Sequence, residues 1–458
     1  MPASASWTNW ARTHRCDPVA IERPKSRREV TAAIERAADA DRAVRVAGSG
    51  HSFSPAVPTD GTLLRLDRLS RILDADAATG LARVEAGIAL GDLGHGLRER
   101  GLALPNLGDI DVQSLAGALA TGTHGTGARF PNLSAQVESM ELVLADGTYR
   151  ELSEGDRLRA ARVGLGSLGV VTAVTLRCVP AFRLRGVDRT LPLDDVLASL
   201  DERVDGHDHF EFWTFPHSPL ALTRANDRTE EPVRTPGPRA AWVHDVLLDN
   251  HALLVLMRAA RRFPRAIPAI NRFAARAASG RERVDWSHRV FASPRLVRFD
   301  EMEYAIPRAH AAEAVLACRE ILERHPVSFP IELRFVAGDD ALLSPAHGRD
   351  TAYVAVHVFE GMDGEAPFRE VEKLMTGWSG RPHWGKRSFL SARELKPRYA
   401  EWDAFAAVRA ELDPGGRFEN DWARRVLGRV RRAADSGDTA NRDGPQTRRR
   451  EQAEAANE

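Results

Sequence analysis

The alternation of apolar and polar positions over residues 26–180 predicts a mixture of helices and strands. Val30, Ile34 and Ala37 recur at helical spacing after Ser26, which is a suitable N-cap, so a helix is expected there. A hairpin is predicted over 137–152, with its turn at Asp146-Gly147. Further strands are predicted at 44–46, 63–66, 82–86 and 170–176, with a helix at 90–100. The pattern indicates an α+β domain with glycine-rich loops.

The pattern changes after about residue 182. Strands are predicted at 209–215, 298–304, 329–335 and 353–359, and helices at 308–324, in the Arg-rich stretch 240–283 and over much of 366–428. The segment after Arg432 is polar and is expected to be disordered. We therefore predict a first domain at 1–181, a second at 182–432, built on an antiparallel sheet with helices, and a disordered polar tail at 433–458.

Composition describes an ordinary globular chain of 458 residues, with 43% hydrophobic and 28% charged residues. The 64 basic and 64 acidic residues cancel, so nothing draws the whole chain toward nucleic acid, and no nucleic-acid partner is predicted. Only four of the basic residues are lysines. A coding bias toward arginine explains this scarcity. Against that bias, each lysine that remains is more often expected to be kept for its chemistry.

Three widely spaced cysteines, at 16, 178 and 318, predict neither a disulfide framework nor a zinc site, and no metal is expected. Neither a signal peptide nor a membrane-spanning run is recognised, so a cytoplasmic protein is predicted. The Arg-rich stretch 240–283 has an apolar background and suits weak peripheral association with the inner membrane face. An ordinary solvated or interdomain helix is the favoured interpretation.

One literal dinucleotide fingerprint occurs, Gly164-Leu-Gly-Ser-Leu-Gly169. A Rossmann motif needs a strand before it and a helix after it. Here a helix-like segment, 156–162, precedes the glycines and a β-branched strand follows them. We therefore reject nicotinamide binding at this site.

Two other loops combine glycines with hydroxyl side chains. Residues 48–52 read Gly-Ser-Gly-His-Ser, which suits either a tight turn or a cradle of backbone N–H groups around a pyrophosphate. His51 is then either an exposed loop histidine or a nucleophile that attaches a cofactor. The second segment, 114–127, is dense in small residues and suits backbone lying along an extended polar ligand.

Three further features suggest a site for chemistry. Glu332 and Arg334 are two apart in a predicted strand, so they share one face and form either a solvent ion pair or an acid/base and orienting pair. His357 lies in another predicted strand, as a structural residue or a substrate contact. Lys386 is either a surface lysine or a cation that stabilises developing negative charge.

These motifs together resemble a known family. The segments 45–55 and 107–127 resemble the PCMH-type FAD-binding domain of the vanillyl-alcohol oxidase superfamily. Glu301-Met-Glu-Tyr304, Glu332-Leu-Arg334, His383-Trp-Gly-Lys386 and the segment 412–420 resemble its sugar-1,4-lactone oxidase and alditol oxidase branch, which includes gulonolactone and arabinonolactone oxidoreductases. The resemblance extends from about Trp7 to Gly428.

The resemblance implies a two-domain fold with FAD between the domains, and a last helical segment that returns toward the flavin. It implies a covalent link from His51 to the C8-methyl of the isoalloxazine ring. Glu332, Arg334 and Lys386 are implied as catalytic residues, and these three with Ser114 and His357 as the substrate-binding set. The implied cofactor-binding residues are Gly48, Ser49, Gly50, His51, Ser52, Ser114, Gly117, Gly122, Thr123, Gly125, Thr126, Val171 and His383.

The function implied is oxidation of a CH–OH group of a gulono- or arabinono-1,4-lactone, with hydride transfer to flavin N5 and oxygen as acceptor. Glu332 would handle the proton, while Arg334 and Lys386 would polarise the alcohol oxygen and the reduced flavin. The alternatives are a lactone dehydrogenase using a quinone or cytochrome, in which Gln113 blocks oxygen, and an oxidase of polyols such as xylitol or sorbitol. A non-catalytic flavoprotein and an NADPH-dependent reductase are disfavoured.

Overall fold

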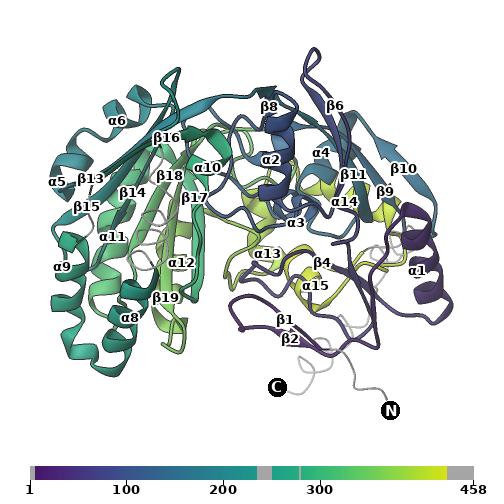
Figure 1. Cartoon of the computed structure of the whole chain (residues 1–458). Helices are drawn as coiled ribbons and strands as arrows, with labels where there is room; N and C mark the ends of the chain where they lie inside the picture. Colours follow the sequence, from purple (N-terminus) through teal and green to yellow (C-terminus); the bar gives the residue numbers. More distant parts are fainter. Residues whose placement is uncertain (1–5, 235–249, 278–279, 431–458) are drawn as a thin grey trace, which may run out of the picture.

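The computed structural model describes residues 6–234, 250–277 and 280–430. Two halves, each with its own sheets, lie side by side in Figure 1, and the chain passes from the first to the second near residue 182. Both halves combine helices with sheets, which confirms the predicted α+β class. No helix in these three ranges is long and apolar enough to cross a lipid bilayer.

The described part of the first half contains an antiparallel sheet in the order β10-β9-β11-β7-β6 and a parallel sheet in the order β3-β5-β4. Two short strand pairs, β1-β2 and β8-β12, flank them. The strands are β1 Trp7–Thr8, β2 Arg15–Cys16, β3 Ala20–Glu22, β4 Val44–Ala47, β5 Thr62–Arg65, β6 Ile72–Asp76, β7 Leu81–Glu85, β8 Leu102–Ala103, β9 Val137–Val143, β10 Tyr149–Leu152, β11 Val170–Arg177 and β12 Val179–Pro180. The helices are α1 Arg27–Asp39, α2 Leu90–Glu99, α3 Leu115–Ala120, η1 Leu133–Gln136 and α4 Gly155–Arg162.

Local chemistry explains several of these boundaries. The Ser26 hydroxyl accepts a hydrogen bond from the backbone N–H of Glu29 at 3.2 Å, so α1 begins where the N-cap predicts. The Asp146 carboxylate accepts from the N–H of Thr148 at 2.9 Å and closes the predicted hairpin between β9 and β10. Helix α4 precedes the glycines at 164–169 and β11 follows them, as predicted.

The second half is built on one antiparallel sheet, whose described strands follow the order β16-β13-β15-β14-β18-β19-β17-β20. The strands are β13 Arg183–Pro192, β14 His209–Thr214, β15 Leu220–Thr229, β16 Arg281–Trp286, β17 Phe299–Pro307, β18 Ile331–Val336, β19 Thr351–Phe359 and β20 Arg381–Pro382. The helices are α5 Leu193–Ala198, α6 Leu200–Gly206, α8 Leu253–Arg262, η3 Pro264–Ala266, α9 Ile267–Ala277, α10 Ser287–Phe291, η4 Arg308–His310, α11 Ala311–Glu323, α12 Glu365–Gly377, α13 Ala392–Leu395, η5 Lys396–Arg398, α14 Trp402–Leu412 and α15 Asp421–Leu427.

The structure corrects the prediction of a helix over all of 240–283. Residues 281–283 begin strand β16, which pairs with β13 from Arg183 opposite Trp286 to Asp188 opposite Arg281. The sequence Arg-Glu-Arg-Val-Asp-Trp alternates in the strand period, a signal that the arginine density of the stretch obscured. Residues 240–249 and 278–279, and the tail at 433–458, lie outside the described residues.

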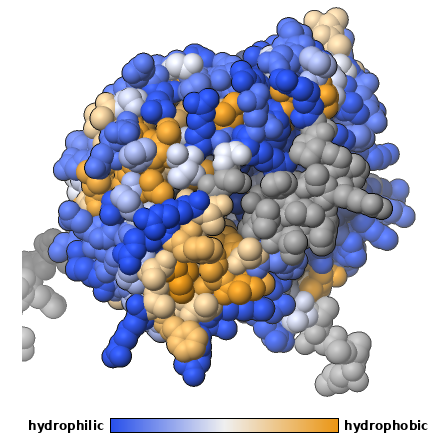
Figure 2. Space-filling model, turned by 60° about the vertical axis from the view of Figure 1, so that its left-hand side comes forward, coloured by the Kyte–Doolittle hydropathy of each residue, from blue (hydrophilic) through white to orange (hydrophobic). Residues whose placement is uncertain are grey.

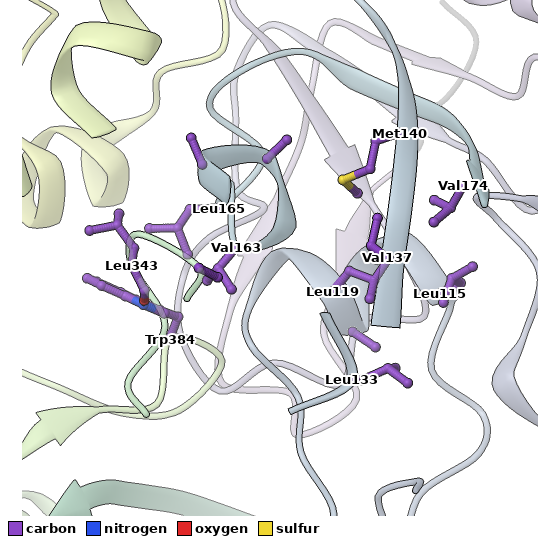
Figure 3. Packing of buried hydrophobic residues seen from close by; sticks show 14 of the residues in the cluster. Leu115, Leu119, Leu133, Val137, Met140, Val163, Leu165, Val174, Leu343 and Trp384 are labelled. Carbon is purple, nitrogen blue, oxygen red and sulfur yellow. The ribbon is translucent and has the colours of Figure 1, made fainter. Parts of the chain in front are cut away.

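The last helices return to the first half. Hydrophobic side chains of α14 and α15, such as Trp402 and Trp422, belong to the same buried cluster as Leu115 and Met140. Figure 3 shows another connection, in which Trp384 and Leu343 lie beside Val163 and Leu165. The Trp384 indole N–H donates to the Leu343 carbonyl at 2.6 Å. Because both halves share this core, the boundaries at 181 and 432 stay predictions.

Candidate active site

A cavity with about 1430 Å³ of open space lies in the first half. Its walls come from the loop after β4, the start of α3, the glycine segment before β11 and Trp422 of α15. Of the predicted cofactor-binding residues, those that line it are Gly48, Ser49, Gly50, His51, Ser52, Ser114, Gly117 and Val171.

The loop after β4 has the properties of an anion cradle. The backbone N–H groups of Ser49, Gly50, His51 and Ser52 donate to none of the described residues. Gly50 has a φ of +76°, and such a left-handed turn lets neighbouring N–H groups converge. Four consecutive backbone donors without protein partners at the wall of a cavity fit a pyrophosphate, because successive N–H groups in such a turn form an anion-binding concavity.

Gly48 and Ser114 form the closest approach between the two loops. A Cβ atom on Gly48 would lie 2.3 Å from the Ser114 Oγ, well inside contact distance. Only glycine therefore fits at position 48 while Ser114 keeps this rotamer. The two loops therefore pack directly against each other along the cavity that both of them line.

His51 lies in the same wall. Its ring stacks on Trp10, with the centroids 5.2 Å apart. Burial, and then the nearby Lys386 ammonium, lower the pKa of His51 to about 4. The imidazole is therefore neutral at physiological pH, which is the form that acts as a nucleophile.

The other predicted cofactor-binding residues lie elsewhere. A Cβ atom on Gly125 would lie 2.4 Å from the Leu107 carbonyl oxygen, so this glycine serves loop packing. Thr126 donates through Oγ1 to the Phe210 carbonyl at 2.5 Å and ties its loop to the second half. Gly122, Gly125 and Thr126 line neither cavity, whereas Thr123 and His383 line a second one.

This second cavity, with about 880 Å³ of open space, adjoins the first, and Gln113 lines both. Strands β17, β18 and β19 form one wall, and the segment 383–386 contributes to it. Four of the predicted site residues, Glu332, Arg334, His357 and Lys386, line it, while Ser114 lies only on the first cavity. Aromatic side chains complete the lining, namely Trp213, Phe215, Phe299 and Phe329.

Glu332 and Arg334 share one face of β18, as their spacing predicts, and they form a buried ion pair. The Arg334 guanidinium also lies 3.0 Å from Asp109 and 3.1 Å from Glu211. Asp109 pairs in turn with Arg295. Burial opposes ionisation of Asp109, but Arg334 and Arg295 outweigh it and hold its pKa well below the usual range.

Glu301 lies within reach of two nitrogen-bearing side chains, Lys386 and His357. One carboxylate oxygen lies 2.5 Å from the Lys386 Nζ, and the other lies 3.5 Å from the His357 Nε2. The His357 Nδ1 is 2.9 Å from the Pro330 carbonyl oxygen, and its Nε2 also lies 3.8 Å from Glu332. Burial opposes the charged form of His357, but Glu301 and Glu332 outweigh it and raise the pKa of this imidazole above its usual value.

Backbone hydrogen bonds fix the position of Lys386. The N–H of His383 donates to the Glu303 carbonyl at 3.0 Å, so this segment runs beside β17. The N–H of Phe53 donates to the Gly385 carbonyl at 2.7 Å and connects the lysine to the loop that carries His51. Burial opposes the charge on Lys386, but Glu301 and Glu303 outweigh it and raise its pKa.

A buried group of three residues borders the second cavity. The His124 Nε2 lies 3.2 Å from Glu303, and the His383 Nδ1 accepts from the N–H of Gly385 at 3.0 Å. Burial lowers the pKa of His383 to about 3, so the ring is neutral. The possible ligand atoms of His124, Glu303 and His383 all lie within 4.8 Å of one another, a spacing compatible with a metal ion. The absence of a metal stays a prediction.

The sequence interpretation did not assign roles to several of these charged residues. Glu301 and Glu303 stand two apart in β17, the same spacing that drew attention to Glu332 and Arg334, so that signal was present. Asp109, Glu211 and Arg295 come from three separate segments, and only the strand register and loop packing bring them to Arg334.

Comparison with known proteins agrees with this geometry. A family model described as D-arabinono-1,4-lactone oxidase matches residues 174–426, which is more than half of the chain. The chain belongs to the D-arabinono-1,4-lactone oxidase family. A second model, described as an FAD binding domain, matches residues 18–153 and includes the loop after β4. This member of the family is thus an FAD-dependent oxidoreductase, as the resemblance implied.

Relatives of this family member carry related names. An L-gulono-1,4-lactone dehydrogenase of Mycobacterium tuberculosis is 48% identical, over 93% of this chain and the whole of that protein. The L-gulonolactone oxidase of Mus musculus is 34% identical, over 92% of this chain and 97% of that protein. An alditol oxidase of a Streptomyces species is also 34% identical, over 93% and 99% respectively.

Solved structures confirm the predicted two-domain fold. Cholesterol oxidase of Brevibacterium sterolicum superposes with a TM-score of 0.79 at 19% identity, over 92% of this chain and 96% of that one. A solvent-stable cholesterol oxidase gives a TM-score of 0.80 at 21% identity, over 93% and 97% respectively. At these identities the likeness concerns the fold alone.

Proposed function

We propose that this protein oxidises a CH–OH group of a sugar-1,4-lactone of the gulono- or arabinono- type, with FAD as the cofactor. The observation that carries the proposal is the junction of the two cavities at Gln113. One cavity has the free backbone donors that suit FAD, and the other has a row of buried charges that suits a small polyhydroxylated molecule.

Each residue of the proposed site would have a separate role in the reaction. When bound, FAD supplies the acceptor for the hydride that leaves the carbinol carbon. We assign Glu332 to take the hydroxyl proton, and Arg334 to hold that carboxylate in place through their ion pair. His357 and Lys386 would orient the substrate oxygens, and the Lys386 ammonium would stabilise negative charge as it develops. Ser114, in the wall of the cofactor cavity, would help to orient the substrate at the junction.

We further propose that His51 attaches FAD covalently through the C8-methyl group. Three observations support this: His51 lines the cofactor cavity, its ring is held by stacking on Trp10, and its lowered pKa keeps the imidazole neutral. The three cysteines are free thiols, which supports a reducing compartment such as the cytoplasm.

Oxygen is the acceptor that we propose, and a dehydrogenase that uses a quinone or cytochrome is the second candidate. The second candidate is favoured by the name of the relative from Mycobacterium tuberculosis, which is 48% identical to this chain. A polyol such as xylitol or sorbitol is the alternative substrate, favoured by the alditol oxidase relative.

An anaerobic substrate panel tests the proposal. The purified protein is mixed with gulono-, galactono- and arabinono-1,4-lactone and with xylitol and sorbitol, and loss of the oxidised flavin absorbance is followed. The expected result is fastest bleaching by one of the lactones. Readmitting air then separates the acceptors, because an oxidase restores the yellow colour with one peroxide per turnover. Bleaching by none of the five compounds would contradict the proposal.

A further inference from the structure

Helices α8 and α9 form an unusually basic surface at one corner of the second half. Residues 250–277 contain six arginines and no aspartate or glutamate, in a chain whose net charge is zero. All six side chains are exposed. None of them forms an ion pair with a carboxylate of the residues that the structure describes. They are Arg258, Arg261, Arg262, Arg265, Arg272 and Arg276.

Large apolar side chains stand among these arginines. Val255 is 64% exposed, and Phe263 and Phe273 are each 60% exposed. Figure 2 turns this side of the molecule forward and shows an orange area low on the surface, bordered by blue. Apolar side chains that gather on an exposed surface with a charged border mark sites of contact with a protein or a membrane.

The helical spacing places both kinds of residue on one face of each helix. On α8, Val255, Arg258 and Arg262 are separated by three and four positions, and all three are exposed. On α9, Arg272, Phe273 and Arg276 share the face opposite the buried Asn271 and Ala275. The helices lie next to each other in Figure 1, so the two faces belong to one corner of the molecule. We call this corner the α8–α9 surface.

We propose that the α8–α9 surface docks on a bilayer that contains anionic phospholipids. Arginine guanidinium groups match the negative charge of the headgroups, and phenylalanine side chains enter the boundary between headgroups and acyl chains. A second copy of this chain is a poor occupant, because it would bring two sets of six positive charges together. Phenylalanines exposed among arginines favour a lipid bilayer over a purely polar polyanion, because only the bilayer offers an apolar region that can bury their rings.

Docking would hold the substrate cavity close to the bilayer. Leu253, in the first turn of α8, lines the second cavity. Other apolar residues of α8 and α9 pack against a small core that contains Trp10, Phe53 and Phe299. The two helices thus pack against residues that line the second cavity. The proposal does not depend on which lactone is oxidised.

Co-sedimentation of the full chain with vesicles tests the proposal. We expect binding to vesicles of phosphatidylcholine with about one third phosphatidylglycerol, no binding to pure phosphatidylcholine, and release as the salt concentration rises. Arg258, Arg265 and Arg272 form no side-chain hydrogen bond or ion pair with the residues that the structure describes, and they are changed together to Gln. This variant should bind about 100-fold more weakly at low salt.

A matched control removes the same charge elsewhere. Arg28, Arg68 and Arg393 are exposed and lie outside α8 and α9, and their triple change to Gln should leave vesicle binding intact. The pair Phe263→Ser and Phe273→Ser should also weaken binding while all the arginines remain. Equal loss in the control variant, or wild-type binding that ignores lipid charge, would overturn the proposal. A wild-type dimer that the phenylalanine variant dissociates would do the same. Flavin reduction by a soluble substrate should be unchanged in every variant and reports intact folding.

Discussion

The carboxylate of Glu301 lies 2.5 Å from the ammonium of Lys386, and both side chains are buried at the wall of the proposed substrate cavity. The same carboxylate lies 3.5 Å from His357 on the neighbouring strand β19. One carboxylate therefore contacts both the Lys386 ammonium and the His357 imidazole. Because Glu332 pairs with Arg334, Glu301 is the main carboxylate that raises the pKa values of His357 and Lys386.

Changing Glu301 to Gln should lower the pKa of His357. Burial alone lowers this pKa, and Glu301 is the larger of the two carboxylate contributions that raise it. In the wild type, a raised pKa gives stability that is present below the unfolded value of about 6.5 and is lost as the pH rises through the folded-state value. The variant should lose that contribution. A histidine NMR titration measures the shift directly, and an unchanged His357 titration would contradict this role of Glu301.

Changing Glu332 to Gln should slow anaerobic reduction of the flavin by about 100-fold or more, since removal of a general base typically costs this much. The protein should stay yellow, because Glu332 lies in the second cavity and not in the one that suits FAD. Stopped-flow absorbance measures the rate. Glu320→Gln, at an exposed position on α11, is the matched control and should reduce at the wild-type rate. Equal rates in the two variants would remove Glu332 from the mechanism.

Changing His51 to Ala should convert a covalent flavin into a dissociable one. Acid-precipitated wild-type protein is expected to give a yellow pellet, whereas the variant should leave its flavin in the supernatant. The exposed His95 provides a control, and His95→Ala should keep the yellow pellet. A colourless pellet from the wild type would refute the covalent attachment and leave FAD binding itself unaffected.

Sequence reasoning was strongest where the chemistry is local. The two-residue period predicts that Glu332 and Arg334 share a face, and the glycines at 48 and 50 predict a loop that can cradle an anion. It did not predict the contacts that depend on packing between distant parts of the chain. The register that sets Glu211 opposite Arg334 joins strands more than 100 residues apart, which no local pattern encodes. Gly125 and Thr126 make loop-packing contacts, and the cofactor role of residues 122–126 stays a prediction.

Gly48→Ala should destabilise the protein by about 1–3 kcal/mol, because the new Cβ would overlap the Ser114 Oγ. Adding Ser114→Ala should recover most of this loss, since the remaining Cβ at position 114 is 3.5 Å away. Gly377→Ala, where no atom lies within 4 Å of the new Cβ, is the control and should cost little. Thermal unfolding of the two single variants and the double variant measures the coupling. Additive effects at 48 and 114 would show that the overlap is not the cause.

Glu211→Gln should remove part of the pH dependence of stability. Burial, with like charge from Glu332 and Asp109, raises the pKa of Glu211 to about 7 despite Arg334 and Arg224. A raised carboxyl pKa contributes stability below the unfolded value of about 4.3, and this contribution is lost as the pH rises through the folded-state value.

The Glu211→Gln variant lacks this titration, so its stability relative to the wild type should increase steadily between about pH 5 and pH 8. Urea unfolding at several pH values gives the difference, and Glu320→Gln should show none. If the difference instead stayed constant over this range, Glu211 would be ionised throughout, and its ion pair with Arg334 at 3.1 Å would outweigh burial.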